Sequence, residues 1–553
     1  MMNKISVNRL TRLLQPQVVV IGALLILCIR LFSYTARFAV NMMFWDQWFV
    51  WAPFFDQRDW VSAFRLQHGP HRQGLGSFLI YGVAQLSRWD GRADAYLVAT
   101  VLCLAGALAL VLKRRYVGSF AYIDVIIPLL FLNLNQWETL TVVSNVSHSA
   151  LPLLLIMLYA IVLTFQSALI QTSLLLVANF LLLYTGFGIF AAFVTPLLFL
   201  LRAIFPAKMG FERASRWLWA AGFALSIVSL LTFFSDWIFT TAVTCAVLPH
   251  PKPWEYLIFA GLQISQGFGL APIADHLIAA NTLTLILGLA IALASTIVIF
   301  ISTASRRAAA PAFLAAFSLL FVGGTAVGRV CLSATEQPLQ SKYATLVLPL
   351  ILGIYLWVSA HRPQWRAITG GSICGLIILG QVPPFFRDPY AVLPQFYYDA
   401  KTKWKACYLA HYQTKECDDA AGFPMAPNGS QLVLQRLRML EKGHLNLFKE
   451  LPSDIQITTP VDDSVLTDPN MVLKGTVDPL GFERYEVQWG RGEFPETWEW
   501  LSGPHKGAVR DAELTHWDMS VLPSGLYTIR VTTYLQDGTW GVAMTRFRWK
   551  PAV

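Results

Sequence analysis

The feature that most constrains this chain is a series of apolar runs, each close to 20 residues long, that continues to about Leu379 and then stops. A helix of about 20 apolar residues is long enough to cross the hydrocarbon core of a bilayer. Only 14% of the 553 residues are charged, against about 25% in ordinary soluble domains. The sequence therefore predicts an α-helical polytopic membrane protein with a soluble tail.

Basic residues between the runs predict how the chain is oriented. Lys4, Arg9 and Arg12 precede the first run, and cations of this kind remain in the cytoplasm. That run has no convincing cleavage site, so we expect it to remain as a span. We expect about eleven spans, near 18–40, 93–112, 119–134, 148–165, 168–185, 187–204, 217–238, 277–302, 310–328, 343–360 and 367–383.

Two shorter runs, 74–86 and 255–271, are ambiguous because each is short and contains glycine. If both crossed the membrane, every basic loop between them would lie outside. The charge pattern therefore favours a helix in the interface for 74–86 and no full crossing for either run. This layout places the N-terminus in the cytoplasm and the C-terminus outside. Because short spans do occur, a different count remains the alternative.

The chain is expected to comprise three parts: a transmembrane domain over 1–383, a polar connector with short helices over 384–453, and a β domain over 454–553. The last part has six or seven β-branched and aromatic runs separated by turn signals, a pattern typical of an immunoglobulin-like sandwich.

The seven cysteines fall into two groups. Cys407 and Cys417 lie close together in the polar connector, and we expect a disulfide between them if that segment is outside the cytoplasm. The other five are in or near apolar runs and are expected to be small buried hydrophobic residues: Cys28, Cys103, Cys245, Cys331 and Cys374.

The formal charge of +9 does not indicate a nucleic-acid partner, because much of it is in short loops between apolar runs. The sequence has no recognisable nucleic-acid-binding motif. It also has no CxxC, HExxH or other cluster with the spacing of metal ligands.

The stretch MFWDQW places Asp46 between Trp45 and Trp48, directly after the first span. A carboxylate beside a bilayer has a desolvation cost and usually has a function. In a transferase that uses a lipid-phosphate sugar donor, it can act as the general base for the acceptor hydroxyl. The alternative is that Asp46 caps an interfacial helix that the tryptophans anchor.

The same outer loop continues through HGPHR, which contains His68, His71 and Arg72. Cations are less expected on the outer side, and an anionic ligand such as phosphate explains them. The alternative is that the cationic side chains snorkel to lipid head groups. Two histidines without a fitting third ligand do not make a metal site.

The motif NQWETL follows the third predicted span on the outer side and contains Gln136 and Glu138. Glu138 could orient the acceptor, or hold a divalent cation with Asp46. The alternative is an ordinary acid at a helix end in water. His148 opens the next span and could face the same cavity.

Arg329 and the segment SKYATL, with Lys342 and Tyr343, bracket a later outer loop. These cations could bind the phosphate of a lipid. The alternative is interfacial anchoring, for which lysine and tyrosine are both favoured.

Together, FWDQW, the HGPHR element with the interfacial helix after it, NQWETL and SKYATL resemble GT-C glycosyltransferases over about residues 1–450. These enzymes take sugars from polyprenyl-phosphate or polyprenyl-diphosphate donors outside the cytoplasm. The resemblance implies that Asp46 is the base and that Arg329 and Lys342 contact the donor phosphate. The chain departs from the pattern in lacking a paired DD or DxD at Asp46 and in having Lys342 where arginine is usual.

The sequence thus predicts a glycosyltransferase of the bacterial inner membrane with a periplasmic C-terminal part. Its partners would be membrane lipids, a polyprenyl-phosphate-linked sugar and a periplasmic glycan, lipid or protein acceptor, and a divalent cation remains an open question. Two alternatives are a transporter or flippase of a lipid-linked saccharide and a non-enzymatic envelope assembly protein. Donor phosphate would contact His71, Arg72, Arg329, Lys342 and Tyr343, while Trp45, Trp48, His68, Gln136 and His148 would contact acceptor or donor.

Overall fold

The computed structural model describes residues 15–206, 215–239, 243, 245–270, 278–302, 308–380, 392–426, 430–450 and 454–551. The chain divides into two compact units, Met1–Tyr398 and Asp399–Val553. The cations of the N-terminal segment, on which the predicted orientation partly depends, lie outside the described residues.

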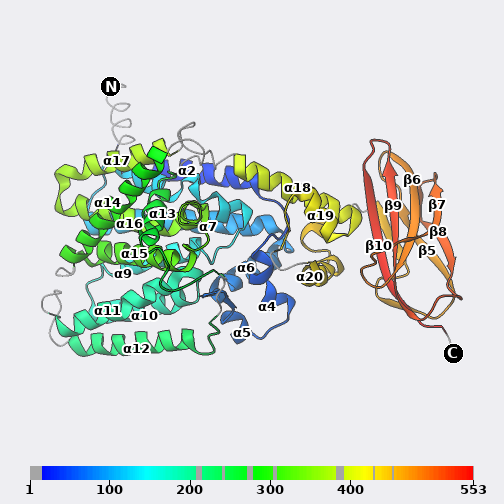
Figure 1. The fold of residues 1–553 in the computed structure, drawn as a ribbon, viewed down its shortest axis with the longest axis horizontal. Helices are drawn as coiled ribbons and strands as arrows, with labels where there is room; N and C mark the ends of the chain where they lie inside the picture. The colour runs from blue at the N-terminus through cyan, green and yellow to red at the C-terminus, as the bar shows by residue number, and fades with distance from the viewer. Residues whose placement is uncertain are drawn as a thin grey trace, which may run out of the picture. The chain divides into compact units, whose positions relative to one another are not determined.

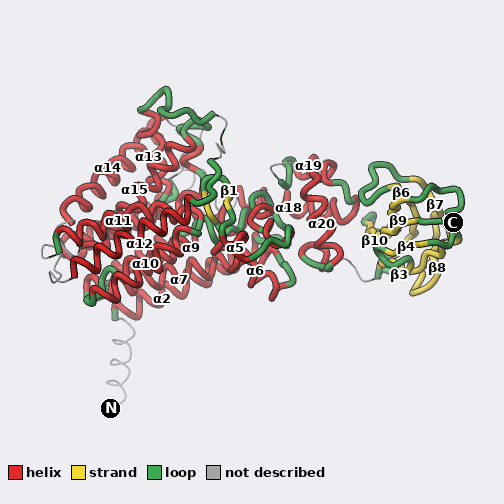
Figure 2. Tube along the Cα trace, turned by 90° about the horizontal axis from the view of Figure 1, so that it is seen from below, coloured by secondary structure: helices red, strands yellow, loops and turns green. Residues whose placement is uncertain are grey.

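The first unit is built almost entirely from helices (Figures 1 and 2). Within the described residues, seven helices are long and apolar enough to cross a membrane: Pro16–Phe38, Gly91–Val117, Gly186–Ile204, Arg216–Phe234, Asn281–Ile301, Ala309–Arg329 and Ser341–His361. Many of their apolar side chains remain exposed, among them Ile26 at 67% and Leu231 at 64%. Such large exposed apolar surface fits a lipid environment rather than water. The membrane prediction is confirmed at this level.

The remaining four predicted spans correspond to shorter helices. Three are α9 (Ala150–Val162), α10 (Ala168–Leu183) and α17 (Arg366–Leu379). The run 119–134 is broken into η1 (Tyr122–Val125), α8 (Ile126–Phe131) and η2 (Leu134–Gln136). Asn133 lies between α8 and η2, where its side chain accepts the backbone N–H of Asn135, an alternative to continued helical bonding.

The two ambiguous runs form α6 (Gly74–Ser87) and α13 (Trp254–Gln266), which are 14 and 13 residues long. At about 1.5 Å per residue each is roughly 20 Å long, less than the ~30 Å of a hydrocarbon core. Helices α9 and α17, which were predicted as spans, are equally short, so the expectation that α6 and α13 do not cross stays a prediction.

The other elements of the first unit are α2 (Pro16–Phe38), α3 (Gln47–Val50), α4 (Ala52–Phe55), α5 (Trp60–Phe64), β1 (Gln67–His68), β2 (His71–Arg72), α7 (Gly91–Val117), η3 (Glu138–Val142), η4 (Gly186–Gly188), α11 (Ile189–Ile204), α12 (Arg216–Phe234), α14 (Ile278–Ser302), α15 (Ala309–Arg329), η7 (Gln337–Leu339), η8 (Ser341–Val347), α16 (Leu348–His361) and η9 (Pro363–Trp365). Helices α10, α11 and α12 pack together along one edge, and α15 packs against α16 (Figure 1). Helix α18 (Val392–His411) contains the boundary between the units.

The second unit contains α19 (Thr414–Ala421), α20 (Ser430–Lys442), η10 (Asn446–Glu450) and two sheets. The sheets have the orders β4-β10-β9-β6-β7 and β3-β5-β8, and Figure 2 draws their strands in yellow. Leu473 and Leu514 of the smaller sheet share one buried cluster with Val487 and Ile529 of the larger sheet. The strands are β3 (Ile455–Thr459), β4 (Ser464–Leu466), β5 (Asn470–Val477), β6 (Phe482–Arg491), β7 (Glu499–His505), β8 (Val509–Asp518), β9 (Gly525–Leu535) and β10 (Trp540–Trp549).

Part of the predicted connector packs with this β region. Arg438 of α20 is 4% exposed and forms ion pairs with Asp462 at 2.6 Å and with Glu493 at 3.3 Å. A nearly buried guanidinium requires such partners because its desolvation is costly. The helices after Tyr398 therefore belong to the same unit as the strands.

Two disulfides are present among the described residues. Cys407–Cys417 joins α18 to α19, as predicted. Cys245–Cys331 was not predicted, and the expectation that these two cysteines are simple buried hydrophobic residues is wrong. Both lie outside the helices that contain the neighbouring apolar runs: Cys331 closely follows the end of α15 at Arg329, and Cys245 lies in the segment after α12, which ends at Phe234. Hydropathy alone did not show that these two cysteines lie outside the apolar helices.

Candidate active site

A short hairpin carries the histidines of the first predicted outer loop. Strands β1 and β2 pair so that His68 lies opposite His71 and Gln67 lies opposite Arg72. Gly69 has a φ of 55°, the left-handed conformation that a tight hairpin turn requires and that glycine adopts readily. Opposite residues share a face and consecutive residues alternate. His68 and His71 therefore lie on one face, and Arg72 lies on the other.

The carboxylate of Asp46 lies beside the face that carries the histidines. Its Oδ1 is 3.8 Å from Nε2 of His68, and the two side chains are 28% and 24% exposed. Asp46 precedes α3 but makes no side-chain capping hydrogen bond to it. The geometry therefore favours a ligand-facing carboxylate over the helix-cap alternative.

His148 joins this group from the loop between η3 and α9. Its ring centroid is 6.4 Å from that of His68 and 6.0 Å from that of His71. Phe187 of η4 packs edge-on against His71 at 4.3 Å. Segments more than 100 residues apart thus meet around three imidazoles.

Glu138 holds the SKYATL segment in place. Its Oε2 accepts the backbone N–H of Lys342 at 3.2 Å, and its Oε1 is 3.7 Å from Nζ of Lys342. Ser341 Oγ accepts the N–H of Glu138 at 3.1 Å and donates to the carbonyl of Asn135 at 2.5 Å. Glu138 begins η3, a π-helical turn, a rare element that is frequent at functional sites. These contacts favour a role for Glu138 in positioning Lys342 over one in orienting the acceptor.

Arg329, the last residue of α15, supplies a cation to the same group. It acts electrostatically on His68, His71 and His148. Within the part of the chain that the structure describes, its guanidinium has no hydrogen bond and no ion pair. Lys342 also acts on His148, but its charge is balanced by Glu138. The site therefore contains an unbalanced guanidinium, which favours an anionic ligand.

An apolar cavity of about 290 Å³ adjoins these groups. Its polar members include His71, Arg329 and Tyr343. Most of its lining is apolar: Pro70, Phe187, Ile189, Phe190, Phe239, Val243, Ala246, Leu248 and Val327. An apolar cavity with a few polar groups is typical of a site for a ligand that is apolar at one end and charged at the other.

The environment keeps all three imidazoles neutral at pH 7. Burial lowers the pKa of His68, with Arg329 acting in the same direction and Asp46 opposing it. Burial also lowers the pKa of His71 well below its ordinary value, and the neighbouring imidazoles and Arg329 add to this effect. The pKa of His148 falls to about 4, chiefly through burial. Neutral imidazoles can accept a proton or donate a hydrogen bond.

Arg72 does not join the site, although the sequence predicted a phosphate contact. It is 2% exposed, and its guanidinium donates to the carbonyls of Phe233 and Ser235 and to Asp236 Oδ1, the last at 2.7 Å. These partners fix the loop after α12 to the hairpin. The alternation along β2 sends Arg72 away from His71, so this geometry gives Arg72 a structural role.

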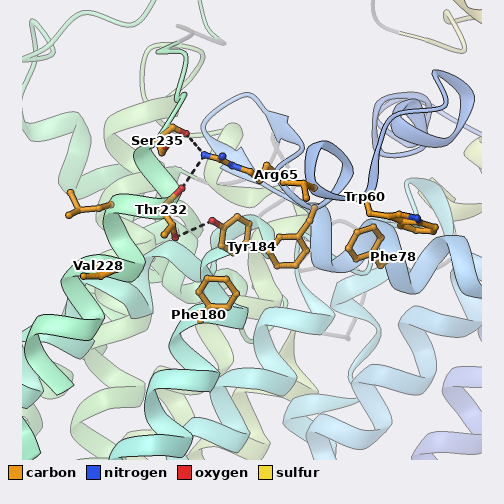
Figure 3. A pocket seen from close by; sticks show the side chains of 11 residues that line it. Trp60, Arg65, Phe78, Phe180, Tyr184, Val228, Thr232 and Ser235 are labelled. Carbon is orange, nitrogen blue, oxygen red and sulfur yellow. Dashed lines mark hydrogen bonds between the residues drawn. The ribbon is translucent and has the colours of Figure 1, made fainter. Parts of the chain in front are cut away.

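A separate groove of about 730 Å³ lies beside the hairpin, between α5, α6, α10 and α12. Figure 3 shows the guanidinium of Arg65 turned toward Ser235 and Thr232, whose carbonyls are 2.8 and 3.5 Å away. The hydroxyl of Tyr184 meets that of Thr232 at 3.1 Å (Figure 3). The lining is mainly apolar and includes none of the predicted site residues.

Three other predicted contact residues are placed differently. Trp48 is 1% exposed and packs against Phe55, and Gln136 is fully buried with its amide donating to the carbonyl of Phe131 at 2.8 Å. Both therefore belong to the interior. Trp45 is partly exposed, has a φ of 53° and packs against Phe44. It lies near the site because it directly precedes Asp46 in the sequence.

Two polar residues of the site were missed. Gln73 and Asn145 are 0% and 1% exposed, and Nδ2 of Asn145 donates to Oε1 of Gln73 at 3.0 Å. Nε2 of Gln73 lies 2.7 Å from Nε2 of His148. The available signal was an amide directly before an apolar helix, a position where burial requires a partner.

No group of three or more His, Cys, Asp or Glu side chains that could hold a metal ion occurs among the described residues. The predicted pairing of Glu138 with Asp46 around a divalent cation has no support in the contacts, because Glu138 is engaged by Lys342. Whether a cation takes part stays a prediction without a defined ligand set.

Neither protein families, curated proteins nor solved structures yield a match to this chain.

Proposed function

We propose that this protein is a membrane glycosyltransferase that moves a sugar from a polyprenyl-phosphate-linked donor to an acceptor outside the cytoplasm. The observation that carries the proposal is that Asp46 and the unbalanced Arg329 act on the same two imidazoles, His68 and His148. The apolar cavity extends from Arg329. An acid, a cation and an apolar cavity are the three elements that such a reaction requires.

In this proposal the isoprenoid chain of the donor occupies the apolar cavity and its phosphate pairs with Arg329. Guanidinium is suited to phosphate because its N–H groups can bind two oxygens at once. Lys342, held by Glu138, adds a second cation near the phosphate. Departure of the sugar leaves negative charge on the phosphate oxygen, which both cations stabilise.

Asp46 is the proposed general base. It takes the proton of the acceptor hydroxyl as that oxygen attacks the anomeric carbon. Its partly exposed carboxylate, 3.8 Å from His68, makes no capping hydrogen bond to the following helix. Both features support a reactive group.

The proposed layout is eleven spans with the site and the C-terminal unit on the periplasmic side of the bacterial inner membrane. Disulfides form in oxidising compartments. Both bridges, Cys245–Cys331 and Cys407–Cys417, fall in segments that this layout puts outside, which supports it. We further propose that the two-sheet region is an immunoglobulin-like sandwich.

The test compares Asp46→Asn with Asp56→Asn in a strain that lacks the chromosomal copy. Asp56 is an exposed acid of the same loop and pairs with Arg58 at 2.9 Å, so it is a matched control. Mass spectrometry of envelope glycans, lipids and glycoproteins should show a modification that Asp56→Asn retains and Asp46→Asn loses at equal protein level. Retention of that modification by Asp46→Asn would rule out the base.

A transporter or flippase would give a different result. Its variant at Asp46 would leave the donor on the cytoplasmic side, whereas a failed transferase leaves unused donor outside. Labelling of lipid-linked sugar from the periplasmic side separates the two. An assembly protein would depend on the β region rather than on Asp46.

A further inference from the structure

The two buried amides beside His148 have a fixed orientation. The backbone N–H of Ser147 donates to Oδ1 of Asn145 at 2.9 Å, and a backbone N–H can only donate. The other side-chain atom of Asn145, Nδ2, therefore donates to Oε1 of Gln73 at 3.0 Å. Consequently Gln73 presents its NH₂ group, not its oxygen, to Nε2 of His148 at 2.7 Å.

This orientation selects one tautomer of His148. An amide N–H donates, so Nε2 of His148 must accept and cannot carry a proton. A neutral imidazole then carries its proton on Nδ1. The chain of hydrogen bonds from Ser147 to His148 thus makes Nδ1 a hydrogen-bond donor.

The Nδ1–H group is available to a ligand. Nδ1 of His148 forms no hydrogen bond within the described part of the chain, and the side chain is partly exposed. The groups around it are Asp46, His68, His71, Arg329 and Lys342. Two of them are cations beside which an anion is favoured, and a neutral N–H donor matches an oxygen of that anion.

We propose that His148 contacts a phosphate oxygen of the donor through Nδ1–H, and that Gln73, fixed by Asn145, is the positioning residue that keeps the proton there. This inference rests on the proposed function for the identity of the anion. The tautomer itself does not depend on that function, so the two can be tested separately.

The first experiment measures the tautomer. The protein is labelled with ¹⁵N-histidine in detergent micelles or bilayers, and the His148→Asn variant assigns the resonance among the 10 histidines. The wild type should show neutral His148 protonated on Nδ1. In Asn145→Asp the new carboxylate accepts from both Ser147 and Gln73, so Gln73 turns its oxygen to His148 and the Nδ1-protonated neutral form is lost. A wild-type proton on Nε2, or an unchanged spectrum in a folded Asn145→Asp protein, overturns the proposal.

The second experiment measures binding of farnesyl phosphate, with farnesol as the probe that lacks the phosphate. The asparagine amide nitrogen lies near the position of Nδ1, and the glutamine amide nitrogen near that of Nε2. His148→Asn should therefore keep most of the affinity for farnesyl phosphate, and His148→Gln should lose about tenfold. Farnesol affinity should not change, and His516→Gln, at an exposed site on β8, is the control. Thermal unfolding confirms that each variant is folded.

The combined outcomes separate the two claims. Equal affinities for His148→Asn and His148→Gln overturn the contact with phosphate. If the wild type binds farnesol as tightly as farnesyl phosphate, the proposed lipid-phosphate function fails while the spectrum still decides the role of Gln73.

Discussion

Two arginines that look alike in the sequence should respond in opposite ways to substitution. Arg329 and Arg72 both follow apolar or histidine-rich segments, and both were predicted to bind phosphate. In the fold, the guanidinium of Arg329 has no ion pair within the described residues, whereas that of Arg72 donates to three backbone carbonyls and to Asp236. We expect Arg329→Gln to weaken ligand binding without loss of stability, and Arg72→Gln to do the reverse.

The magnitude for Arg329 follows from its proposed contact. A hydrogen bond to a charged group contributes about 1.5–3 kcal/mol, which corresponds to about 10- to 150-fold in affinity. Arg329→Gln should lose that much affinity for farnesyl phosphate. Arg329→Lys should lose less, because it keeps the charge but not the two-point geometry. Since no partner within the described chain is lost, the melting temperature should stay nearly unchanged.

The magnitude for Arg72 follows from its existing contacts. Arg72→Gln removes the donor to the carbonyls of Phe233 and Arg65 and breaks the pair with Asp236. Arg65 still donates to the carbonyl of Ser235 and to Asp236. Lost partners of buried groups cost about 1–3 kcal/mol, and a broken buried pair costs somewhat more. The Asp236 side chain is 60% exposed and stays hydrated. We therefore expect Arg72→Gln to lower the free energy of unfolding by about 2–4 kcal/mol in total.

The assay pairs ligand binding with thermal unfolding in the same detergent. Farnesyl phosphate and farnesol are titrated against wild type, Arg329→Gln, Arg329→Lys and Arg72→Gln. Arg58→Gln is the control, since Arg58 is exposed and pairs with Asp56, two residues away. The reasoning is refuted if Arg329→Gln binds farnesyl phosphate like the wild type, or if Arg72→Gln loses phosphate affinity with an unchanged melting temperature.

Three further predictions concern the rest of the site. Glu138→Ala should lower transfer activity several-fold more than Glu138→Gln, because the amide oxygen can still accept the N–H of Lys342; equal activities in a transfer assay would contradict this. Loss of the disulfide Cys245–Cys331, which closes a loop of 86 residues, should lower the melting temperature more than loss of Cys407–Cys417, which closes one of 10. Chain entropy sets upper bounds of about 4.5 and 3 kcal/mol on what the two disulfides contribute to stability. Variants with one cysteine of each pair replaced by serine, followed by thermal unfolding, measure the difference. Acid should destabilise the protein, because the pKa of His148 is about 4 in the fold and near 6.5 when unfolded. The contribution of neutral His148 to folding stability is therefore complete above pH 6.5 and declines toward pH 4. His148→Asn should flatten this part of the curve of stability against pH.

The broad architecture followed from the sequence because it depends on local pattern. Runs such as 93–112 and 310–328 are apolar over enough residues to cross a bilayer, and the helices Gly91–Val117 and Ala309–Arg329 correspond to them. The alternating runs after residue 454 gave strands for the same reason, since side chains in a strand point to opposite faces in turn. Hydropathy did not show that the run 119–134 is broken, because Asn133 acts through a single side-chain hydrogen bond.

The sequence predicted which loops form the candidate site, but not which of their residues face a ligand and which hold the loops in place. Topology indicated that the segments of Asp46, His148 and Lys342 reach the same side, because basic loops alternate with apolar runs. Which residue faces which way depends on tertiary contacts: Arg72 turns away from His71 on its strand, and Glu138 binds Lys342 rather than a ligand. Gln73 was overlooked because its partners, Asn145 and His148, are 72 and 75 residues away in the sequence.

By itself, the sequence determined that this chain has a membrane-spanning helical part and a β region, since helix length, apolar period and turn residues are all local properties. Only the tertiary structure decided which cation has no partner among the described residues, which cysteines pair and which imidazole nitrogen is engaged. Those properties depend on distances between residues as far apart as Glu138 and Lys342, and such distances exist only once the chain has packed.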